Sequence, residues 1–366
     1  MQLKSLIRYP FDIHRARRLL ADRPPAERQW QQRPIALDLR TPQLLFDCGR
    51  HLASLSHYAK QAGSSFHVRS GTMMLAAMSR KIHGGEMLAD PECQWLPDSD
   101  PLPAHAMVLC DYAPSASRQD DRQYLQMLIG SEIDRGLPVM PYPMHPATLR
   151  ESERTDFAAL RIRDDRYGIF FAGNQKPRYG DIKMQRNFGV LSRLELISTL
   201  QTHFPSQISP TLDQASPAQS IVLSDSRVNP IKASDWLPSL SRAEFFLCCP
   251  GSSQPTCHNL VEAMSVGTIP LIEYGNRVTP ELRDGVNAIC FEGRNGLIDA
   301  VNRINQMTAA ERRRIRNNVT TFFDEYLCGE KFMGELRDGA IDITAGRICM
   351  PFHESNFYSA TATAAA

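Results

Sequence analysis

The sequence has no long hydrophobic run, and no window approaches the ~18–20 uninterrupted apolar residues that a membrane-spanning helix needs. The N-terminus also lacks the apolar core of a secretory signal, because charged residues interrupt it; these are Arg8, Asp12, His14, Arg15, Arg17 and Arg18. The nine cysteines are an odd number without regular spacing, which is typical of reduced thiols. A cytoplasmic protein is therefore expected.

An excess of charge of either sign is also missing. The 41 Lys and Arg residues nearly balance 40 Asp and Glu residues, so the net charge is +1 and no nucleic-acid partner is expected. Walker loops, G-x-G-x-x-G loops after a strand and G-x-S-x-G elbows are absent. Hydrophobic residues make up 42% of the chain and charged residues 22%, which is typical of a globular protein.

Two patterns suggest a metal site, but neither has the required context. Asp98-Ser99-Asp100 matches a D-x-D motif, yet prolines flank it and no apolar strand precedes it, which favours a solvated turn. The second group lacks a short C-x2-C pair; its members are Cys248, Cys249, Cys257 and His258. No metal site is predicted.

The length of 366 residues predicts two domains of ordinary size, divided near residue 150. In residues 1–150, strand candidates alternate with helical segments, which indicates parallel βαβ units. The predicted strands are 34–39, 65–69, 105–110 and 137–142, and the predicted helices are 42–61 and 120–135. Residues 84–103 are rich in proline and acids and are predicted to be loop, and the Pro-rich segment 141–146 suits a domain hinge.

Residues 1–33 form a basic leader with eight Lys and Arg residues against three acids. Its apolar residues are Leu3, Leu6, Ile7, Phe11, Leu19 and Leu20. Two interpretations stay open. A basic amphipathic stretch can rest on an anionic membrane face, whereas a charged helix face is more often a solvated helix or a strap over its domain.

The second domain is expected over residues 151–345, with a doubly wound sheet. Its predicted strands are 167–172, 220–224, 243–249, 267–272 and 287–291, and its predicted helices are 190–204, 233–240, 280–283, 297–307 and 309–327. A tail over residues 346–366 carries apolar residues that can dock, and its end is expected to be disordered.

The most informative segment is Phe245–Ile272, which predicts a buried strand, a Pro-Gly-Ser-Ser loop, a helix from near Thr256 and another strand. Unpaired amides at a helix N-terminus beyond a strand end bind phosphate, because the helix carries about half a positive charge there. The candidate donor-binding residues of this segment are Ser252, Ser253, Thr256, His258, Asn259 and Glu262. An ordinary αβ unit with a serine N-cap is the alternative interpretation.

Two motifs in this half resemble a known family: "FFAGN" at residues 170–174 and "FFLCCPG…HNLVEAMSVGTIPLI" at residues 245–272. Together they resemble the GT-B glycosyltransferases, most of all the exostosin-like branch. This resemblance implies an α/β protein of two Rossmann-like domains facing each other across a cleft. The first would be the acceptor side and the second would bind a nucleotide-sugar donor.

Two departures from the family pattern bear on mechanism and donor. Many retaining GT-B enzymes carry two glutamates eight positions apart, but the first of these positions holds Gln254 and only the second holds Glu262. Exostosin-like proteins often have an arginine where this chain has His258 or Asn259. The first departure favours inversion at the transferred sugar, and the second leaves the donor unidentified.

Transfer from a nucleotide sugar builds negative charge on the leaving diphosphate, so cations or oriented N–H groups are needed there. GT-B enzymes generally work without a metal, and no cofactor is expected beyond a UDP- or GDP-type donor acting as substrate. Arg178 and Arg186 are the predicted diphosphate partners, because guanidinium groups bind phosphate bidentately. A solvated basic loop is the alternative for each.

An inverting transfer also needs a general base for the acceptor hydroxyl. Asp111, at a strand end, and His145, in the Pro-rich hinge, are the candidate catalytic residues. An aspartate in such a place is often only a turn cap. Asp47, His51 and Glu132 are weaker candidates.

The sequence thus predicts a metal-independent, inverting glycosyltransferase that acts on a saccharide or lipid-linked saccharide acceptor. Surface polysaccharide or glycan assembly at the inner face of a bacterial membrane would suit it, with the basic leader in peripheral contact. A retaining GT-B transferase or a sugar-nucleotide epimerase stays open as an alternative. So does a non-catalytic glycan- or nucleotide-binding protein, since a fold does not fix a function.

Overall fold

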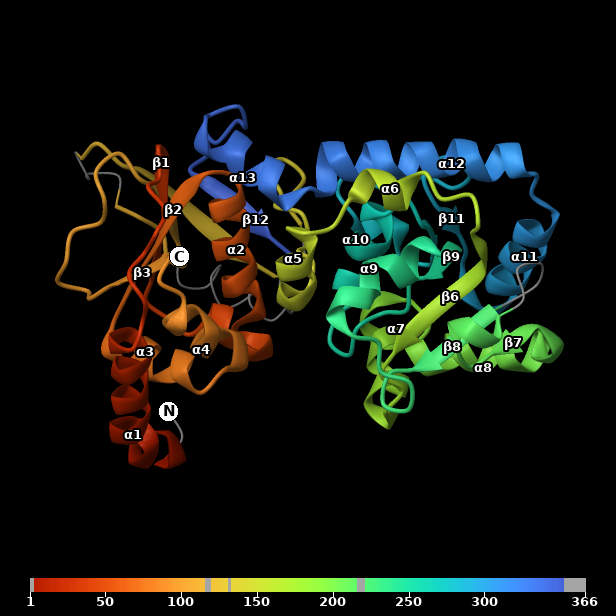
Figure 1. Cartoon of the computed structure of the whole chain (residues 1–366), viewed down its shortest axis with the longest axis horizontal. Helices are drawn as coiled ribbons and strands as arrows, with labels where there is room; N and C mark the ends of the chain where they lie inside the picture. The colour runs from red at the N-terminus through yellow and green to blue at the C-terminus, as the bar shows by residue number, and fades with distance from the viewer. Residues whose placement is uncertain (1–2, 116–119, 131–132, 216–220, 352–366) are drawn as a thin grey trace. The chain divides into compact units, whose positions relative to one another are not determined.

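The computed structural model describes residues 3–115, 120–130, 133–215 and 221–351, without the side chains of residues 3–6 and 46. The chain forms two compact units (Figure 1). The first contains Met1–Pro146 and the segment that begins at Gly329, and the second is Ala147–Cys328. Each unit has its own parallel sheet of six described strands, so the expected pair of Rossmann-like domains is confirmed.

The first unit alternates strands and helices along most of its length. Its elements are α1 (Leu3–Ala21), β1 (Gln32–Leu39), η1 (Gln43–Gly49), α2 (Arg50–Gln61), β2 (Ser64–Ser70), α3 (Thr72–Ser79), α4 (Ile82–Ala89), β3 (Cys93–Leu96), β4 (Met107–Cys110), β5 (Gln123–Ile129), α13 (Gly329–Arg337) and β12 (Arg347–Met350). Helix α5 (Pro146–Ser152) spans the boundary between the units. Among the described residues, no helix is both long and apolar enough to cross a bilayer.

The first sheet has the strand order β12-β5-β4-β1-β2-β3, with every pairing parallel. β1 lies between β2 and β4, and its last five residues are all buried. A strand buried on both faces has to be a near-continuous apolar run, which the segment from Ile35 to Leu39 provides except at Asp38. Because Asp38 interrupts this apolar run, it is a candidate functional residue.

Three sequence predictions for this unit were wrong. The predicted helix over residues 120–135 is instead β5, whose burial alternates residue by residue with the period of a strand. The predicted strand over residues 137–142 forms only one bridge, between Val139 and Cys349. In addition, the predicted loop over residues 84–103 contains most of α4 and all of β3.

The end of the chain returns to the first unit, which the sequence-based boundary at residue 345 did not anticipate. Strand β12 pairs in parallel with the open edge of β5, and α13 packs on α2. Residues 329–345 therefore belong with the first sheet and not with the second domain. The apolar tail does dock, through Ile348 to Met350, while its predicted disordered end lies outside the described residues.

The second unit is a doubly wound sheet with helices in its connections. Its elements are α6 (Phe157–Arg161), β6 (Tyr167–Gly173), η2 (Pro177–Gly180), α7 (Lys183–Phe188), α8 (Arg193–His203), η3 (Pro205–Gln207), β7 (Ile208–Ser209), η4 (Leu212–Gln214), β8 (Ile221–Asp225), α9 (Ala233–Ser241), β9 (Ala243–Leu247), α10 (His258–Ser265), β10 (Ile269–Ile272), η5 (Gly275–Arg277), β11 (Ile289–Cys290), α11 (Gly293–Gln306), α12 (Ala309–Phe322) and the π-helical turn η6 (Phe323–Leu327).

The strand order of this sheet is β11-β10-β9-β6-β8-β7, and its core is aromatic. Phe170 on β6 and Phe246 on β9 lie edge to face, with ring centroids 6.1 Å apart, and Trp236 of α9 contacts both rings. The predicted strands and helices of this half are confirmed except for the helix near residues 280–283, which is irregular.

Candidate functional sites

The second sheet contains a topological switch point between β6 and β9. From β6 the chain first builds β7 and β8 on one side, then returns to add β9 on the other. In open α/β sheets, ligands bind beyond the carboxyl ends of the strands at such a point. The two loops that leave these ends are residues 174–182 after β6 and residues 248–257 after β9. Both contain residues that the sequence singled out.

One buried arginine joins these two loops. Arg193, the first residue of α8, donates from Nη1 to the Asn174 carbonyl (2.9 Å) and from Nη2 to the Pro250 carbonyl (3.0 Å). Its side chain is buried, and its guanidinium lies 3.9 Å from the centre of the Tyr179 ring. No carboxylate among the described residues pairs with it, and its Nε has no hydrogen-bond partner there. A buried cation without a counterion favours binding of an anion.

The loop after β9 has the shape that the sequence predicts. Gly251 donates to the Pro255 carbonyl, and a Cβ on Gly251 would lie 2.9 Å from the carbonyl oxygen of Gln254, so the turn requires glycine. Helix α10 begins at His258, two residues later than predicted, and its N-cap Cys257 makes no side-chain capping bond. Along this loop and first turn the structure gathers the predicted residues Ser252, Ser253, Thr256, His258 and Asn259.

The two predicted diphosphate arginines differ in their surroundings. Arg178 is exposed and donates to the Tyr179 hydroxyl (3.1 Å), so it shares that ring with Arg193 and lies near the switch point. Arg186 is exposed on α7 and donates to the side chain of Asn187 (3.3 Å). Nothing in these contacts brings Arg186 to Arg193, so the structure joins only the first of the pair to the site.

Glu262 has a different environment from the one expected of a sugar ligand. Its side chain has no exposed surface, and it accepts a hydrogen bond from Trp236 Nε1 (2.7 Å). This bond ties α10 to α9 beneath the loop. In this conformation the carboxylate is sealed inside the unit, so its contact with a ribose or sugar stays a prediction.

Two residues that matter for the site escaped sequence reasoning. Besides Arg193, Glu273 follows β10 and accepts from the backbone amides of Leu191 (2.7 Å) and Gly293 (2.8 Å). It thereby anchors the segment that leads into α8, and burial raises its pKa. The one available signal was the capping box of Ser192 and Glu195, which marks the start of α8 and so the position of Arg193.

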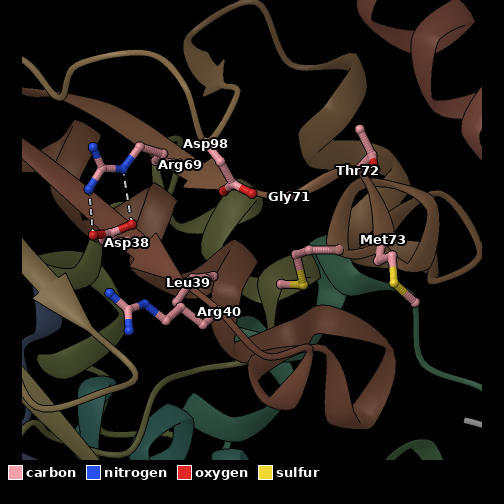
Figure 2. A pocket seen from close by; sticks show the side chains of 9 residues that line it. Asp38, Leu39, Arg40, Arg69, Gly71, Thr72, Met73 and Asp98 are labelled. Carbon is pink, nitrogen blue, oxygen red and sulfur yellow. Dashed lines mark hydrogen bonds and ion pairs between the residues drawn. The ribbon is translucent and has the colours of Figure 1, made fainter.

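The first unit contains a pocket of about 610 Å³ beyond the carboxyl ends of β1 and β2. Its lining residues, all but Met74 labelled in Figure 2, are Asp38, Leu39, Arg40, Arg69, Gly71, Thr72, Met73, Met74 and Asp98. Asp38 and Arg69 form a two-bond ion pair across the strands, with distances of 3.0 and 2.6 Å. The Asp38 carboxylate raises the pKa of Arg69. The walls thus combine charged groups with two thioethers, a mixture that suits a polar ligand with an apolar portion.

The candidate base Asp111 has a structural role in this unit. Its carboxylate accepts from the backbone amides of Arg40 and Thr41, each at 2.8 Å, and from the Thr41 hydroxyl at 2.5 Å. These bonds hold the turn after β1 and position Arg40, which lines the pocket. The contacts argue against Asp111 as the base, since three donors already occupy its oxygens.

The candidate base His145 lies away from the lining of the pocket. Its half-buried ring packs edge-on against His83 at 5.3 Å, and His83 Nδ1 lies 2.9 Å from a carboxylate oxygen of Glu86. Of the weaker candidates, Asp47 pairs with Arg50 and His51 is fully buried against Tyr142. Glu132 lies outside the described residues.

Comparison with known proteins gives matches among solved structures only: no family model matches the chain, and no curated protein matches it. The N-terminal domain of Candida albicans trehalose-6-phosphate phosphatase is 9% identical, with coverage of 87% of this chain and 100% of that one and a TM-score of 0.45. A mutant Thermobaculum terrenum O-GlcNAc transferase is 11% identical, with coverage of 99% of this chain and 75% of that one and a TM-score of 0.40.

A third similar structure is the catalytic domain of starch synthase IV from Arabidopsis thaliana bound to ADP and acarbose. It is 10% identical, with coverage of 92% of this chain and 78% of that one and a TM-score of 0.33. One of these three proteins is a transferase by name. Because all three TM-scores are below 0.5, the proposals that follow depend on this chain's own residues.

Proposed function

We propose that this protein is a glycosyltransferase that binds the diphosphate of a nucleotide-sugar donor at the switch point of its second unit. The observation that carries the proposal is Arg193, a buried guanidinium without a counterion that joins the loops after β6 and β9. A diphosphate is the kind of ligand that would neutralise this charge. The first unit would supply the acceptor side, through the pocket beyond β1 and β2.

The chemistry of the leaving group explains why these residues suit transfer. When the bond between the sugar and the diphosphate breaks, negative charge grows on the leaving oxygen. The guanidinium groups of Arg193 and Arg178 both lie against the Tyr179 ring, and the start of α10 follows the loop that Arg193 holds. Guanidinium and amide groups can balance the new charge, so we propose a metal-independent reaction without a cofactor.

Inversion at the transferred sugar is the stereochemical outcome that we propose. Gln254, where many retaining enzymes carry a glutamate, has a neutral amide, so direct attack by an acceptor hydroxyl is favoured. The pocket in the first unit contains a carboxylate suited to receiving a hydroxyl hydrogen bond, the exposed Asp98, with which no described residue pairs. We propose a saccharide or lipid-linked saccharide acceptor, of the sort used in bacterial surface glycan assembly at the cytoplasmic membrane face.

Nucleotide binding provides the test. Isothermal titration with UDP, GDP and CMP should show binding of at least one nucleotide, and Arg178→Gln should weaken it about tenfold through the loss of a charge-assisted bond. Arg313→Gln is the matched control, because Arg313 is also exposed but lies on α12, outside the loops that follow β6 and β9. Absence of binding by all three nucleotides at millimolar concentration would contradict the proposal.

A second measurement separates an enzyme from a binding protein. Release of the nucleoside diphosphate should require an acceptor, and NMR of the product should show the anomer opposite to that of the donor. Nucleotide binding without acceptor-dependent release would identify a non-catalytic binding protein, and a retained anomer would replace the proposed mechanism with a retaining one.

A further inference from the structure

Helix α1 is attached to the first unit by one side only. Figure 1 shows α1 beside α3 and α4, and the three helices pack together. The Tyr9 hydroxyl donates to Thr72 Oγ1 (2.7 Å), the Ser79 hydroxyl donates to the Asp12 carbonyl (3.0 Å), and Ala16 is fully buried. The inward face is thus fixed by specific contacts along the helix.

The outward face of α1 exposes two large apolar side chains. Ile7 is 67% exposed and Phe11 is 76% exposed, and their spacing of four residues places them on the same side, one turn apart. The basic and histidine side chains exposed around them on this helix are Arg8, His14, Arg15, Arg17 and Arg18. An aromatic ring and an isoleucine in water, ringed by arginines, have no structural purpose within the unit.

Charge is concentrated on this helix. α1 has five Lys and Arg residues and one acid, Asp12, so its formal charge is +4, whereas the whole chain carries +1. All other residues together therefore carry −3. Asp12 does not offset the outward face, because it is half-buried and pairs with Arg80 of the neighbouring segment at 3.3 Å. Among the α1 arginines that the structure describes, only Arg18 has an exposed partner, Asp22, and such solvated pairs are weak.

We infer that the outward face of α1, defined by Ile7, Phe11 and the arginines around them, docks on an anionic lipid membrane. The arginines attract the negative headgroups, and the phenyl and sec-butyl groups enter the boundary between headgroups and acyl chains. Helix α1 lies parallel to the membrane and does not cross it. The inference is independent of the proposed reaction.

The pocket of the first unit lies next to the docked helix. Thr72, which accepts the Tyr9 hydrogen bond, lines the pocket, and so does Met73, which is more than half exposed. Docking of α1 therefore brings the pocket to the lipid surface. A ligand with a polar head and an apolar anchor would reach it there without leaving the membrane.

Vesicle co-sedimentation of the full chain tests the inference. The wild type should bind phosphatidylcholine vesicles that contain phosphatidylglycerol, and much less of it should bind pure phosphatidylcholine or bind in high salt. Phe11→Ala should weaken binding to the anionic vesicles about tenfold, because most of one phenyl group is withdrawn from the lipid. Arg15→Gln should weaken it severalfold.

Ile162→Ala is the matched control, since Ile162 is 77% exposed in the second unit without belonging to α1. It should bind as the wild type does. Equal binding by Phe11→Ala and wild type would overturn the inference, as would equal binding to neutral and anionic vesicles. A mass in solution that falls from dimer to monomer in Phe11→Ala, or tight binding of a short oligonucleotide that Phe11→Ala abolishes, would assign the face to another partner instead.

Discussion

At the scale of single residues, the ring of Tyr179 lies against two guanidinium groups. The guanidinium of Arg193 lies 3.9 Å from its centre and that of Arg178 lies 5.0 Å from it. Cations over an aromatic face are held by its negative quadrupole, which lets two like charges approach the same side chain. Two positive groups so close to one another, one buried and one exposed, are an arrangement that an anionic ligand would stabilise.

Another single residue makes the first unit sensitive to acid. His67 on β2 is buried, with its Nε2 3.1 Å from the Ser65 hydroxyl, and burial lowers its pKa to about 4. In the unfolded chain the pKa is about 6.5, so the unfolded state binds the proton first as the pH falls. The stability that neutral His67 contributes is complete above pH ~6.5 and is lost as the pH falls towards ~4.

We therefore expect the free energy of unfolding to fall by on the order of 2 kcal/mol between pH 7 and pH ~4.5 through this residue. Urea unfolding of His67→Gln at both pH values should show a smaller drop than the wild type does. His14→Gln, with an exposed side chain on α1, is the control and should keep the drop of the wild type. If the free energy of unfolding fell equally in all three proteins, His67 would not be the cause of the acid sensitivity.

At the scale of elements, the junction of β6 with its loop depends on a glycine. A Cβ on Gly173 would lie 2.7 Å from the far end of the Phe171 ring, which is buried in the core, and 3.4 Å from Nη1 of Arg193. Glycine at this position therefore lets the Phe171 ring lie against the end of the strand. The motif "FFAGN" contains both the ring and the glycine, so its spacing has a packing explanation apart from any resemblance.

Gly173→Ala should lower the free energy of unfolding by about 1–3 kcal/mol through overpacking. It should also weaken nucleotide binding, because the displaced Phe171 ring is the one whose centre lies 5.5 Å from the Arg193 guanidinium. Gly296→Ala in α11 is the control, because its added Cβ would find ordinary contacts at 3.6 Å and longer and should stabilise the helix slightly. Chemical unfolding and titration of both variants give the comparison. If Gly173→Ala bound the nucleotide as tightly as the wild type does, Gly173 would have no role in forming the binding site.

The elements also show which structure the sequence could predict. Buried strands such as β6 and β9 were found because their apolar runs are continuous and are followed by Gly or Pro. Strand β5 was missed because the acids at its start suggested a helix N-terminus, while its alternation is short. Strand β12 was missed because its pairing partner, β5, lies more than 200 residues earlier in the chain. The intrinsic strand propensity of the residues in β5 and β12 therefore does not by itself explain why these two strands were missed.

The candidate sites also contain one part that the sequence could predict and other parts that it could not. The loop after β9 was predictable because its serines, glycine and helix start lie within one segment. Arg193 was not, because its importance comes from two carbonyls on loops that flank it at distances of 19 and 57 residues. The pocket of the first unit was hidden for a similar reason, since its lining comes from the ends of β1 and β2 and from the distant Asp98.

At the scale of the whole molecule, the chain leaves the first unit once and returns to it once. The return occurs at Gly329, the first residue of α13, where the glycine lies against the ring of Tyr58 on α2. Arg337, at the end of the same helix, donates to the carbonyl of Ala62 and to the Ser64 hydroxyl (3.3 Å). The last helix thus closes the first unit, although its sequence follows that of the second.

This arrangement predicts that a substitution at Gly329, where the chain returns, destabilises the first unit and leaves the second unit unchanged. A Cβ on Gly329 would overlap the buried Tyr58 ring, whose hydroxyl accepts from the Met144 amide (3.1 Å), so Gly329→Ala should destabilise the first unit by about 1–3 kcal/mol. Gly334→Ala, in the same helix with nothing closer than 3.9 Å, should not. Hydrogen exchange should accelerate in β1 and β2 but not in β6 and β9, and nucleotide binding should be unchanged. Faster exchange in both sheets would mean that the two units unfold together.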